Sequence, residues 1–258
     1  MIPSDNALSQ LFNNANFVAI LTGAGVSAES GISTFRGAGG IWSKFKPEEL
    51  ANVEAFLSNP IMVWEWYQHR RDILADAHPN AGHMALAEWE SIAPRFTLIT
   101  QNVDGLHRMA GSQNVLELHG NIRINRCHNC GRESEEETVK FSGRVPICPA
   151  CGGMLRPGVV WFGESLPRRE LDEAFRAAET CDVFLSVGTS TVVYPAASLP
   201  EIARSAGARV IEVNTEETPF TPLASLHLRG TAGAILPRLV NAYRRGREFH
   251  DEGKEVNS

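Results

Sequence analysis

Long hydrophobic runs and an excess of positive charge are both missing from this chain. No stretch of about 18 apolar residues occurs, which excludes a membrane-spanning helix. The first residues, MIPSDNALSQLFNN, lack the basic flank and apolar stretch of a signal peptide. With 24 basic and 30 acidic side chains the net charge is −6, so no overall positive field exists to hold nucleic acid or an anionic membrane. We therefore expect a cytoplasmic protein that binds neither.

The composition is otherwise that of an ordinary globular protein. Apolar residues make up 43% of the 258 residues and charged residues 21%, which disfavours disorder, collagen and coiled coil. No internal repeat or low-complexity tract is present. At roughly 150 residues per domain, the length predicts one large domain or one large domain with a small insert.

Short apolar runs alternate with helical patterns along the chain. In Pro167 to Thr180, for example, Leu171, Ala174, Phe175 and Ala178 share one helical face. The apolar runs are typical of buried strands that stop at polar or glycine-containing segments, and they are residues 16–21, 96–100, 115–118, 183–188 and 210–213. Strands alternating with helices predict an α/β fold with a doubly wound parallel sheet.

Cysteine is scarce, and four of the five residues form two C-x-x-C pairs. Cys127 and Cys130 are separated from Cys148 and Cys151 by seventeen residues, a spacing typical of a four-thiolate zinc site. Four sulfurs fill a tetrahedral shell, so the metal is expected to be structural. The segment from about Asn125 to Arg156 has few apolar residues for a core of its own, which predicts a small metal-stapled insert. Cys181, in an apolar context, is expected to be a packed residue.

A glycine-rich segment, AILTGAGVSAESGISTFRGAGG, follows the first predicted strand. Its residues Gly23, Gly25, Ser27, Gly31 and Gly37 suit a backbone that approaches a pyrophosphate closely, although glycines also mark ordinary turns. Phe35 and Arg36 could cover and clamp a nucleotide, or be a core aromatic beside a surface cation.

Polar side chains follow other predicted strands at the edge where α/β sheets bind ligands. Gln101, Asn102 and Asp104 could hydrogen-bond sugar hydroxyls and a carboxamide, or cap a helix that begins near Val103. His119, in LELHGN, has the residue type of a base that works near neutrality. Residues 187–193 and 212–217 place small polar residues at further strand ends.

Taken in order, several motifs resemble the sirtuin family of NAD-dependent protein deacylases. They are GAGVSAESGISTFRG, TQNVD, the LHG around His119, the two C-x-x-C pairs, VVWFGE, VGTS and VNTE, and the resemblance runs from about Asn16 to Pro237. It implies a single catalytic region over 1–258 with a large Rossmann-like NAD-binding domain of approximately 1–35, 82–122 and 157–246. A smaller zinc-binding domain is implied at approximately 36–81 and 123–156, and a polar or frayed tail at 247–258.

The resemblance also implies the residues that contact NAD. The glycine loop with Phe35 and Arg36 would hold the cofactor, the segment after the second strand would reach the nicotinamide ribose and carboxamide, and later strand ends would serve the adenosine. The implied set is Gly23, Ala24, Gly25, Ser27, Phe35, Arg36, Trp42, Gln101, Asn102, Asp104, Gly188, Thr189, Ser190, Asn214, Thr215, Glu216 and Ala232.

The same resemblance implies that NAD is consumed as a co-substrate and that one residue acts as the catalytic base. The acyl-lysine oxygen attacks the ribose carbon that bears nicotinamide and gives an alkylamidate, and His119 acts through the ribose hydroxyls. The products are nicotinamide, 2'-O-acyl-ADP-ribose and free lysine, which makes the enzyme an acyl transferase acting on proteins and peptides. Val160, Trp161, Phe162, Gly163 and Glu164 resemble the short strand that pairs with substrate backbone. We expect a monomer.

The acyl preference follows from one helical segment, VWEWYQHRRDIL. Tyr67 shares a helix face with Arg70 and with Arg71, so periodicity leaves the two arginines open. The Tyr-x-x-Arg pattern of the family's bacterial-like desuccinylase and demalonylase branch selects Arg70, and an alanine matched by Ala51 leaves room for a longer chain. A guanidinium binds a carboxylate through two hydrogen bonds, so succinyl, malonyl and glutaryl lysine are the expected substrates, with deacetylation retained. The alternative is that Arg70 is a surface residue paired with an acid.

One departure from the common family loop G-I-P-D-F-R is that Ser33 and Thr34 replace Pro and Asp.

Three other functions explain part of the pattern. A dehydrogenase would form NADH and release no nicotinamide, a zinc-ribbon nucleic-acid module would need a basic stripe that this insert lacks, and an ADP-ribosyltransferase would leave ADP-ribose on protein.

Overall fold

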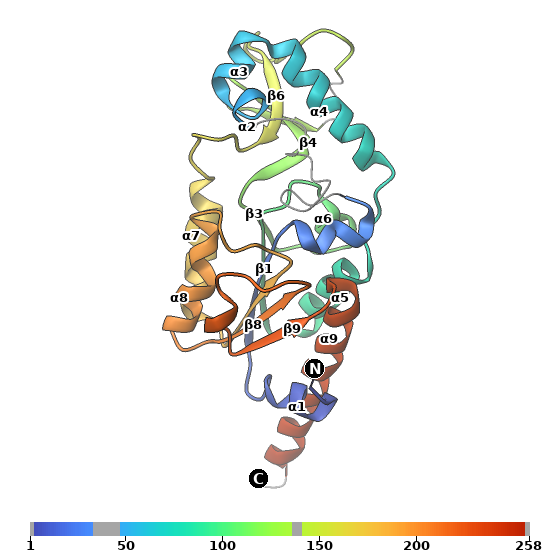
Figure 1. The fold of residues 1–258 in the computed structure, drawn as a ribbon, viewed down its shortest axis with the longest axis vertical. Helices are drawn as coiled ribbons and strands as arrows, with labels where there is room; N and C mark the ends of the chain where they lie inside the picture. The colour runs from blue at the N-terminus through green and yellow to red at the C-terminus, as the bar shows by residue number, and fades with distance from the viewer. Residues whose placement is uncertain (1–2, 33–46, 136–140, 256–258) are drawn as a thin grey trace.

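The computed structural model describes residues 3–32, 47–135 and 141–255. Within these ranges the larger part of the molecule is built on six parallel strands in the spatial order β3-β2-β1-β7-β8-β9 (Figure 1). Numbered along the chain, this order is 3-2-1-4-5-6, the Rossmann arrangement. The strands are β1 (Phe17–Thr22), β2 (Arg95–Thr100), β3 (Val115–Glu117), β7 (Val183–Val187), β8 (Arg209–Asn214) and β9 (Leu226–Arg229).

The central strands are apolar on both faces because both faces are covered. In β1 every residue is buried, with Val18 and Ile20 in one core and Ala19 and Leu21 in the other, as the alternation of side chains along a strand requires. The five apolar runs of the sequence correspond to β1, β2, β3, β7 and β8, so the predicted doubly wound sheet is confirmed. The sequence analysis missed β9, since its residues LHLR alternate apolar and basic side chains at the sheet edge.

Helices cover the two faces of the large sheet. The helices α1 (Asp5–Gln10), α5 (Ala81–Ile92) and α9 (Ala232–Glu255) share one core, in which the rings of Phe12, Trp89 and Tyr243 lie 5.4–5.6 Å apart. The helices α7 (Arg168–Thr180) and α8 (Leu199–Ser205) share the other (Figure 1). Helix α9 continues to Glu255, so the expected polar tail is helical over most of its length. None of the helices in the described ranges has the length and apolar composition needed to cross a membrane.

A smaller lobe lies at one end of the molecule (Figure 1). In the described residues it combines an antiparallel sheet of order β5-β4-β6 with three helices. Its elements are α2 (Pro47–Leu50), α3 (Val53–Ser58), α4 (Pro60–Ala75), β4 (Gly120–Cys127), β5 (Glu133–Glu135) and β6 (Leu155–Val159).

The cysteine-rich segment shares an apolar core with the helices of this lobe. Trp64 of α4 is fully buried, and its indole Nε1 donates to the carbonyl of Leu155 (2.9 Å). Phe56 and Trp161 pack in the same cluster with Cys127 and Cys148. The sequence analysis found few apolar residues for a core within the segment 125–156, and in the structure α3 and α4 supply the apolar surface against which this segment packs.

Candidate active site

The candidate site begins where the strand order of the large sheet reverses, between β1 and β7. The N–H of Gly25 donates to the carbonyl of Gly188 (2.8 Å). A Cβ at Gly23 or Gly25 would lie 2.8 or 2.7 Å from backbone atoms of Gly188, so neither position has room for a side chain. These glycines were predicted to approach a ligand, and in the structure they let the two strand-end loops approach each other. We call this contact the glycine floor of the candidate site.

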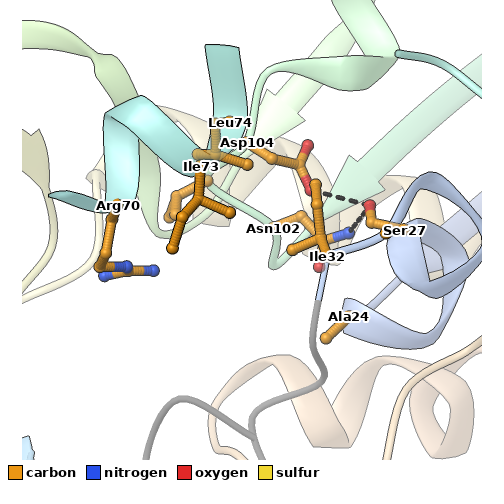
Figure 2. A pocket seen from close by; sticks show the side chains of 10 residues that line it. Ala24, Ser27, Ile32, Arg70, Ile73, Leu74, Asn102 and Asp104 are labelled. Atoms are coloured by element: carbon orange, nitrogen blue, oxygen red, sulfur yellow. Dashed lines mark hydrogen bonds between the residues drawn. The ribbon is translucent and has the colours of Figure 1, made fainter. Parts of the chain in front are cut away.

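A pocket of about 80 Å³ lies beside this floor, and we call it the α4 pocket (Figure 2). One wall follows β1, with Ala24 and Ser27 in the 3₁₀ helix η1 (Ala24–Ser30). A second wall is the segment 102–104 after β2, and the third is α4. Because α4 belongs to the smaller lobe, the pocket lies between the two parts of the molecule.

Ser27, Asn102 and Asp104 form one hydrogen-bonded group in this pocket (Figure 2). The hydroxyl of Ser27 donates to Asp104 Oδ2 (2.7 Å) and accepts from Asn102 Nδ2 (3.1 Å). Asp104 Oδ1 accepts from the N–H of Leu106 in the short helix α6 (Leu106–Met109). Asp104 therefore lines the pocket and also holds the first amide of α6, which begins at Leu106 and not near Val103 as expected. The expected contacts of this group with a sugar or a carboxamide stay predictions.

Two buried histidines that the sequence analysis did not single out lie next to this group. His83 Nδ1 accepts from the N–H of Asn80 (3.3 Å), so its Nε2 carries the proton and faces Ser27 Oγ (3.4 Å). His107 Nε2 lies 2.9 Å from Thr22 Oγ1, and the two imidazole rings are 4.8 Å apart. Burial lowers the pKa of His83, and it lowers the pKa of His107 to about 3. Both rings are therefore neutral packing and hydrogen-bonding groups near neutral pH.

His119 follows β3, at the same edge of the sheet. Its Nδ1 lies 2.9 Å from the carbonyl of Gln101. Since a carbonyl can only accept, Nδ1 carries the proton and Nε2 is the basic nitrogen. Burial lowers the pKa of His119 below its ordinary value of 6.5, and the hydrogen bond to Gln101 partly opposes this. Gln101 Nε2 donates to Thr189 Oγ1 (2.8 Å), so the same residue joins His119 to the loop after β7.

The residues predicted for the adenosine side come from the ends of β7 and β8. Asn214 Nδ2 donates to the carbonyl of Thr189 (3.0 Å), which ties these two ends together. Exposed side chains at this edge are Ser190, Thr215 and Glu216. Ala232 differs from the others, because it is 4% exposed and packs in the core at the start of α9, close to Gly82.

The two arginines of α4 have different surroundings. Arg71 donates to the carbonyls of Ile122 (2.8 Å) and Ile124 (3.2 Å) and to Asn125 Oδ1 (2.9 Å), so it binds α4 to β4. Arg70 lines the α4 pocket and is 8% exposed, which excludes the alternative of a surface helix residue (Figure 2). The structure thus separates two positions that periodicity left open.

Aromatic rings surround Arg70. Its guanidinium carbon lies 4.8 Å from the ring centre of Trp66 and 5.4 Å from that of Tyr67, distances typical of cation–π contacts. Burial lowers the pKa of Arg70 and raises that of Tyr67, yet an arginine stays charged in a protein. Tyr67 accepts a hydrogen bond from Trp161 Nε1 (2.9 Å), which leaves its own proton for donation. Ala51 is buried in the same apolar cluster.

Residues 160–164, expected to form a short strand, lie after the end of β6 at Val159. Phe162 makes an isolated parallel bridge with Asn52, and its N–H donates to the carbonyl of Ala51 (3.0 Å). The amides of Val160, Trp161 and Glu164 also donate within the chain. A regular strand is therefore absent over these described residues, and Phe162 is exposed.

The side chain of Glu164 is committed to an internal ion pair. Its two oxygens accept from Arg156 Nη1 (2.6 Å) and Nη2 (2.7 Å), and one also accepts from the N–H of Trp161 (2.8 Å). The guanidinium of Arg156 lies 3.7 Å from the ring centre of Trp161. Desolvation raises the pKa of Glu164, but the bonds to Arg156 outweigh it and lower the pKa. Glu164 holds the 160–164 segment in shape.

The four paired cysteines come together in the smaller lobe. All their sulfurs lie within 4.8 Å of one another, with 3.4 Å between Cys127 and Cys151 and 3.8 Å between Cys130 and Cys148. A tetrahedral zinc site with Zn–S bonds of about 2.3 Å places its sulfurs about 3.8 Å apart. The cluster therefore fits a structural zinc ion.

Each cysteine pair is followed by a glycine that shapes the turn. Gly131 and Gly152 have φ of +70° and +73°, and their amides donate to the carbonyls of Cys127 and Cys148. The pattern C-x-x-C-G is a sequence signal that the analysis overlooked. Cys181 is buried in the large domain, and burial raises its pKa to about 12, so its thiol stays protonated and packs as expected.

Phe35, Arg36 and Trp42, together with the departures Ser33 and Thr34, lie outside the described residues. Their expected contacts with NAD stay predictions.

Comparison with known proteins decides the family. The model of the Sir2 family matches residues 23–195. The chain belongs to the Sir2 family. A protein of Aquifex aeolicus named NAD-dependent protein deacylase is 55% identical to this sirtuin over 231 residues, which cover 90% of this chain and 96% of that protein. The resemblance drawn from the order of the motifs is confirmed.

Solved structures of the Sir2 family share the fold. A structure described as a Sir2 homolog–NAD complex is 48% identical to this sirtuin, with a TM-score of 0.87 and 95% of each chain covered. A second, described as a Sir2–p53 peptide–NAD+ complex, is 34% identical with a TM-score of 0.82, and covers 93% of this chain and 98% of that one.

Zinc binding is testable through one ligand. Changing Cys148 to Ser should lower bound zinc from about one ion per chain to well below half, and should lower the melting temperature, because a structural zinc ion contributes its binding energy to folding. Elemental analysis and thermal unfolding measure both. Cys181→Ser is the matched control and should keep its zinc. A Cys148→Ser protein with a full zinc content would show that these thiols hold no metal.

Proposed function

We propose that this sirtuin is an NAD-dependent protein-lysine deacylase that prefers acyl groups ending in a carboxylate. The observation that carries the proposal is the α4 pocket, which has the fixed cation Arg70 on one wall and the Ser27, Asn102 and Asp104 group on another. A charged acyl chain that enters it meets the cation while its amide stays near the predicted nicotinamide end of NAD.

The NAD site is proposed at the crevice between β1 and β7. The Rossmann strand order, the glycine floor and the polar strand ends suit a dinucleotide, and a structural neighbour is described as an NAD complex. NAD is consumed as a co-substrate. The acyl oxygen bonds to the ribose carbon as nicotinamide leaves, one water enters, and lysine and 2'-O-acyl-ADP-ribose are released.

His119 is the proposed general base. Its Nδ1–H is held by the carbonyl of Gln101, so the Nε2 lone pair is oriented to accept a proton from a ribose hydroxyl. The lowered pKa keeps this nitrogen unprotonated at neutral pH. Gln101 also contacts Thr189, and it therefore links the position of the base to the loop that would hold the dinucleotide.

Carboxylate recognition is assigned to Arg70 and Tyr67. A buried guanidinium can make two parallel hydrogen bonds to a carboxylate, and such charge-assisted bonds are about twice as strong as neutral ones. Tyr67 can add a third bond, because its oxygen already accepts from Trp161 and its proton remains. The role of Ala51 in leaving room for a longer acyl group rests on the resemblance, since Ala51 packs in the apolar cluster of the smaller lobe and is not among the residues that line the α4 pocket.

The substrate backbone is proposed to lie along residues 160–164, as in strand addition. Since the amides of Val160, Trp161, Phe162 and Glu164 donate within the chain, the amide of Gly163 and carbonyls of the segment would carry the pairing. A structural neighbour is described as a complex with a p53 peptide and NAD+, which supports a peptide substrate for this chain. One structural zinc completes the proposed cofactors.

Replacing the base tests the mechanism. His119→Ala should reduce nicotinamide release and deacylation by at least about 10²-fold, since general-base catalysis contributes about that much, while NAD still binds. Product analysis by mass spectrometry and NAD titration measure the two effects. His69→Ala changes an exposed histidine of α4 and serves as control. Retained turnover in His119→Ala would remove this residue from the mechanism.

The acid side of the pH profile should report the same group. Because burial lowers the pKa of His119 from 6.5, the unprotonated form persists at pH 6.5 and kcat/KM should fall only at lower pH. Rates measured from pH 5 to 9, with circular dichroism to follow folding, test this. An acid limb centred above pH 7 would contradict the assignment.

Arg70→Met tests the acyl preference on one peptide that carries acetyl, malonyl, succinyl or glutaryl lysine. We expect the ratio of desuccinylation to deacetylation to fall about 10²-fold, because two charge-assisted hydrogen bonds are lost. Arg108→Met is the matched control. It removes an arginine whose partners, the carbonyl of Val115 and the carboxylate of Glu117, lie outside the α4 pocket, so it should leave the ratio unchanged. Equal losses on both substrates in Arg70→Met would refute the charged pocket.

A further inference from the structure

Arg123, in the first half of β4, donates hydrogen bonds to two walls of the α4 pocket. Its Nε donates to the carbonyl of Asp104 (3.1 Å) and its Nη2 to the carbonyl of Leu74 (3.0 Å). Asp104 and Leu74 both line the pocket and are labelled in Figure 2, but they come from different parts of the molecule. Arg123 is not among the lining residues and acts through these two.

We propose that Arg123 is a positioning residue that sets the distance between Arg70 and the segment 102–104, and so determines which length of charged acyl chain is accepted. This inference rests on the proposed function, because it assigns the source of selectivity within the same pocket.

The geometry of the guanidinium makes the distance rigid. Its nitrogens lie in one plane at fixed separations, so the carbonyls of Asp104 and Leu74 cannot move apart without breaking a hydrogen bond. Leu74 lies one helical turn after Arg70 on the same face of α4, and a shift of its carbonyl therefore shifts the Arg70 side chain. The carbonyl also belongs to the last turn of α4, where a cation is favoured by the helix dipole.

The surrounding contacts fix Arg123 but do not depend on it. The N–H of Ile122 donates to the carbonyl of Val103 (2.9 Å), and Arg71 binds α4 to the carbonyls of β4. Gly105 has a φ of +76°, and a Cβ there would lie 3.2 Å from Arg123 Cδ, so a glycine leaves room for the arginine. Loss of the Arg123 side chain is thus expected to loosen the spacing of the two walls while the fold persists.

Small changes in this spacing matter for a carboxylate. Malonyl, succinyl and glutaryl chains differ by one methylene at each step, and a misplacement of about 1 Å in a bound group can change a rate by about 10²-fold. An acetyl group carries no carboxylate to bind Arg70, so its removal should not depend on this spacing. The selectivity among charged chains is therefore the property that Arg123 controls.

The test compares Arg123→Met, Arg123→Lys and the wild type on one peptide with acetyl, malonyl, succinyl or glutaryl lysine. We expect the wild type to favour one charged length. In Arg123→Met the ratio of its kcat/KM to that of the acetyl peptide should fall at least about tenfold, and the three charged chains should become similar. Arg123→Lys should restore part of the ratio, because an ammonium keeps the charge without the fixed pair of donors.

Arg108→Met is the matched control. Arg108 also donates to a backbone carbonyl, that of Val115 (3.1 Å), and pairs with Glu117 (3.3 Å), but these partners lie outside the α4 pocket. Its acyl ratios should stay within about twofold of the wild type, since it does not touch the two walls.

Hydrogen exchange supplies a readout that does not depend on the substrate. In Arg123→Met, amides of residues 71–77 and 101–106 should exchange faster together, because one of the links that joins the two walls is lost. Unchanged exchange, or equal losses on all four peptides, would overturn the role of Arg123. If the wild type removes no charged acyl group, the proposed substrate preference fails, and the role in selectivity fails with it. If the wild type does so and the ratios in Arg123→Met are unchanged, only the role of Arg123 is wrong.

Discussion

The close backbone contact between Gly25 and Gly188 is the constraint on which the site depends. It joins the loops after β1 and β7 at the reversal of the strand order, and no Cβ fits between them. The loops after β2 and β3 then deliver Gln101, Asn102, Asp104 and His119 to the same edge. A side chain at Gly23 or Gly25 would collide with the backbone of Gly188 and push these two loops apart.

Much of the fold follows from local pattern. Buried parallel strands are apolar on both faces, so continuous apolar runs such as NFVAIL and VFLSVG can be predicted as strands from the sequence. The edge strand β9 could not be predicted in this way, because its residues LHLR are mostly only partly buried and do not form a continuous apolar run. Likewise, the apolar surface that stabilises the cysteine-rich segment lies on α3 and α4, far away in sequence. Periodicity describes a segment alone, and it cannot tell which distant segment will cover it.

In the candidate site, too, the residues marked by a local sequence pattern could be predicted and the contacts between distant segments could not. The order of the motifs identified the Sir2 family. His119 could be singled out because it follows a predicted strand, and the four paired cysteines because of their C-x-x-C spacing. Contacts between segments that are distant in sequence could not be predicted in this way. Arg71 binds β4 while Arg70 lines a pocket, and Glu164 is held by Arg156. The buried histidines beside Ser27 are His83 and His107. Helical spacing places two arginines near one face but cannot say which of them meets a neighbouring strand.

The hydrogen bonding of residues 160–164 has a consequence for the choice of target proteins. Most of the amides in this segment are already satisfied within the chain, so a bound polypeptide gains few backbone hydrogen bonds there, and backbone bonds do not depend on which residues flank the lysine. Under the proposed function, unrelated proteins become equivalent once their lysines carry the same modification. Accessibility and abundance of the modified lysine would then govern turnover in a mixture, and consensus sequences around the modified position should be weak.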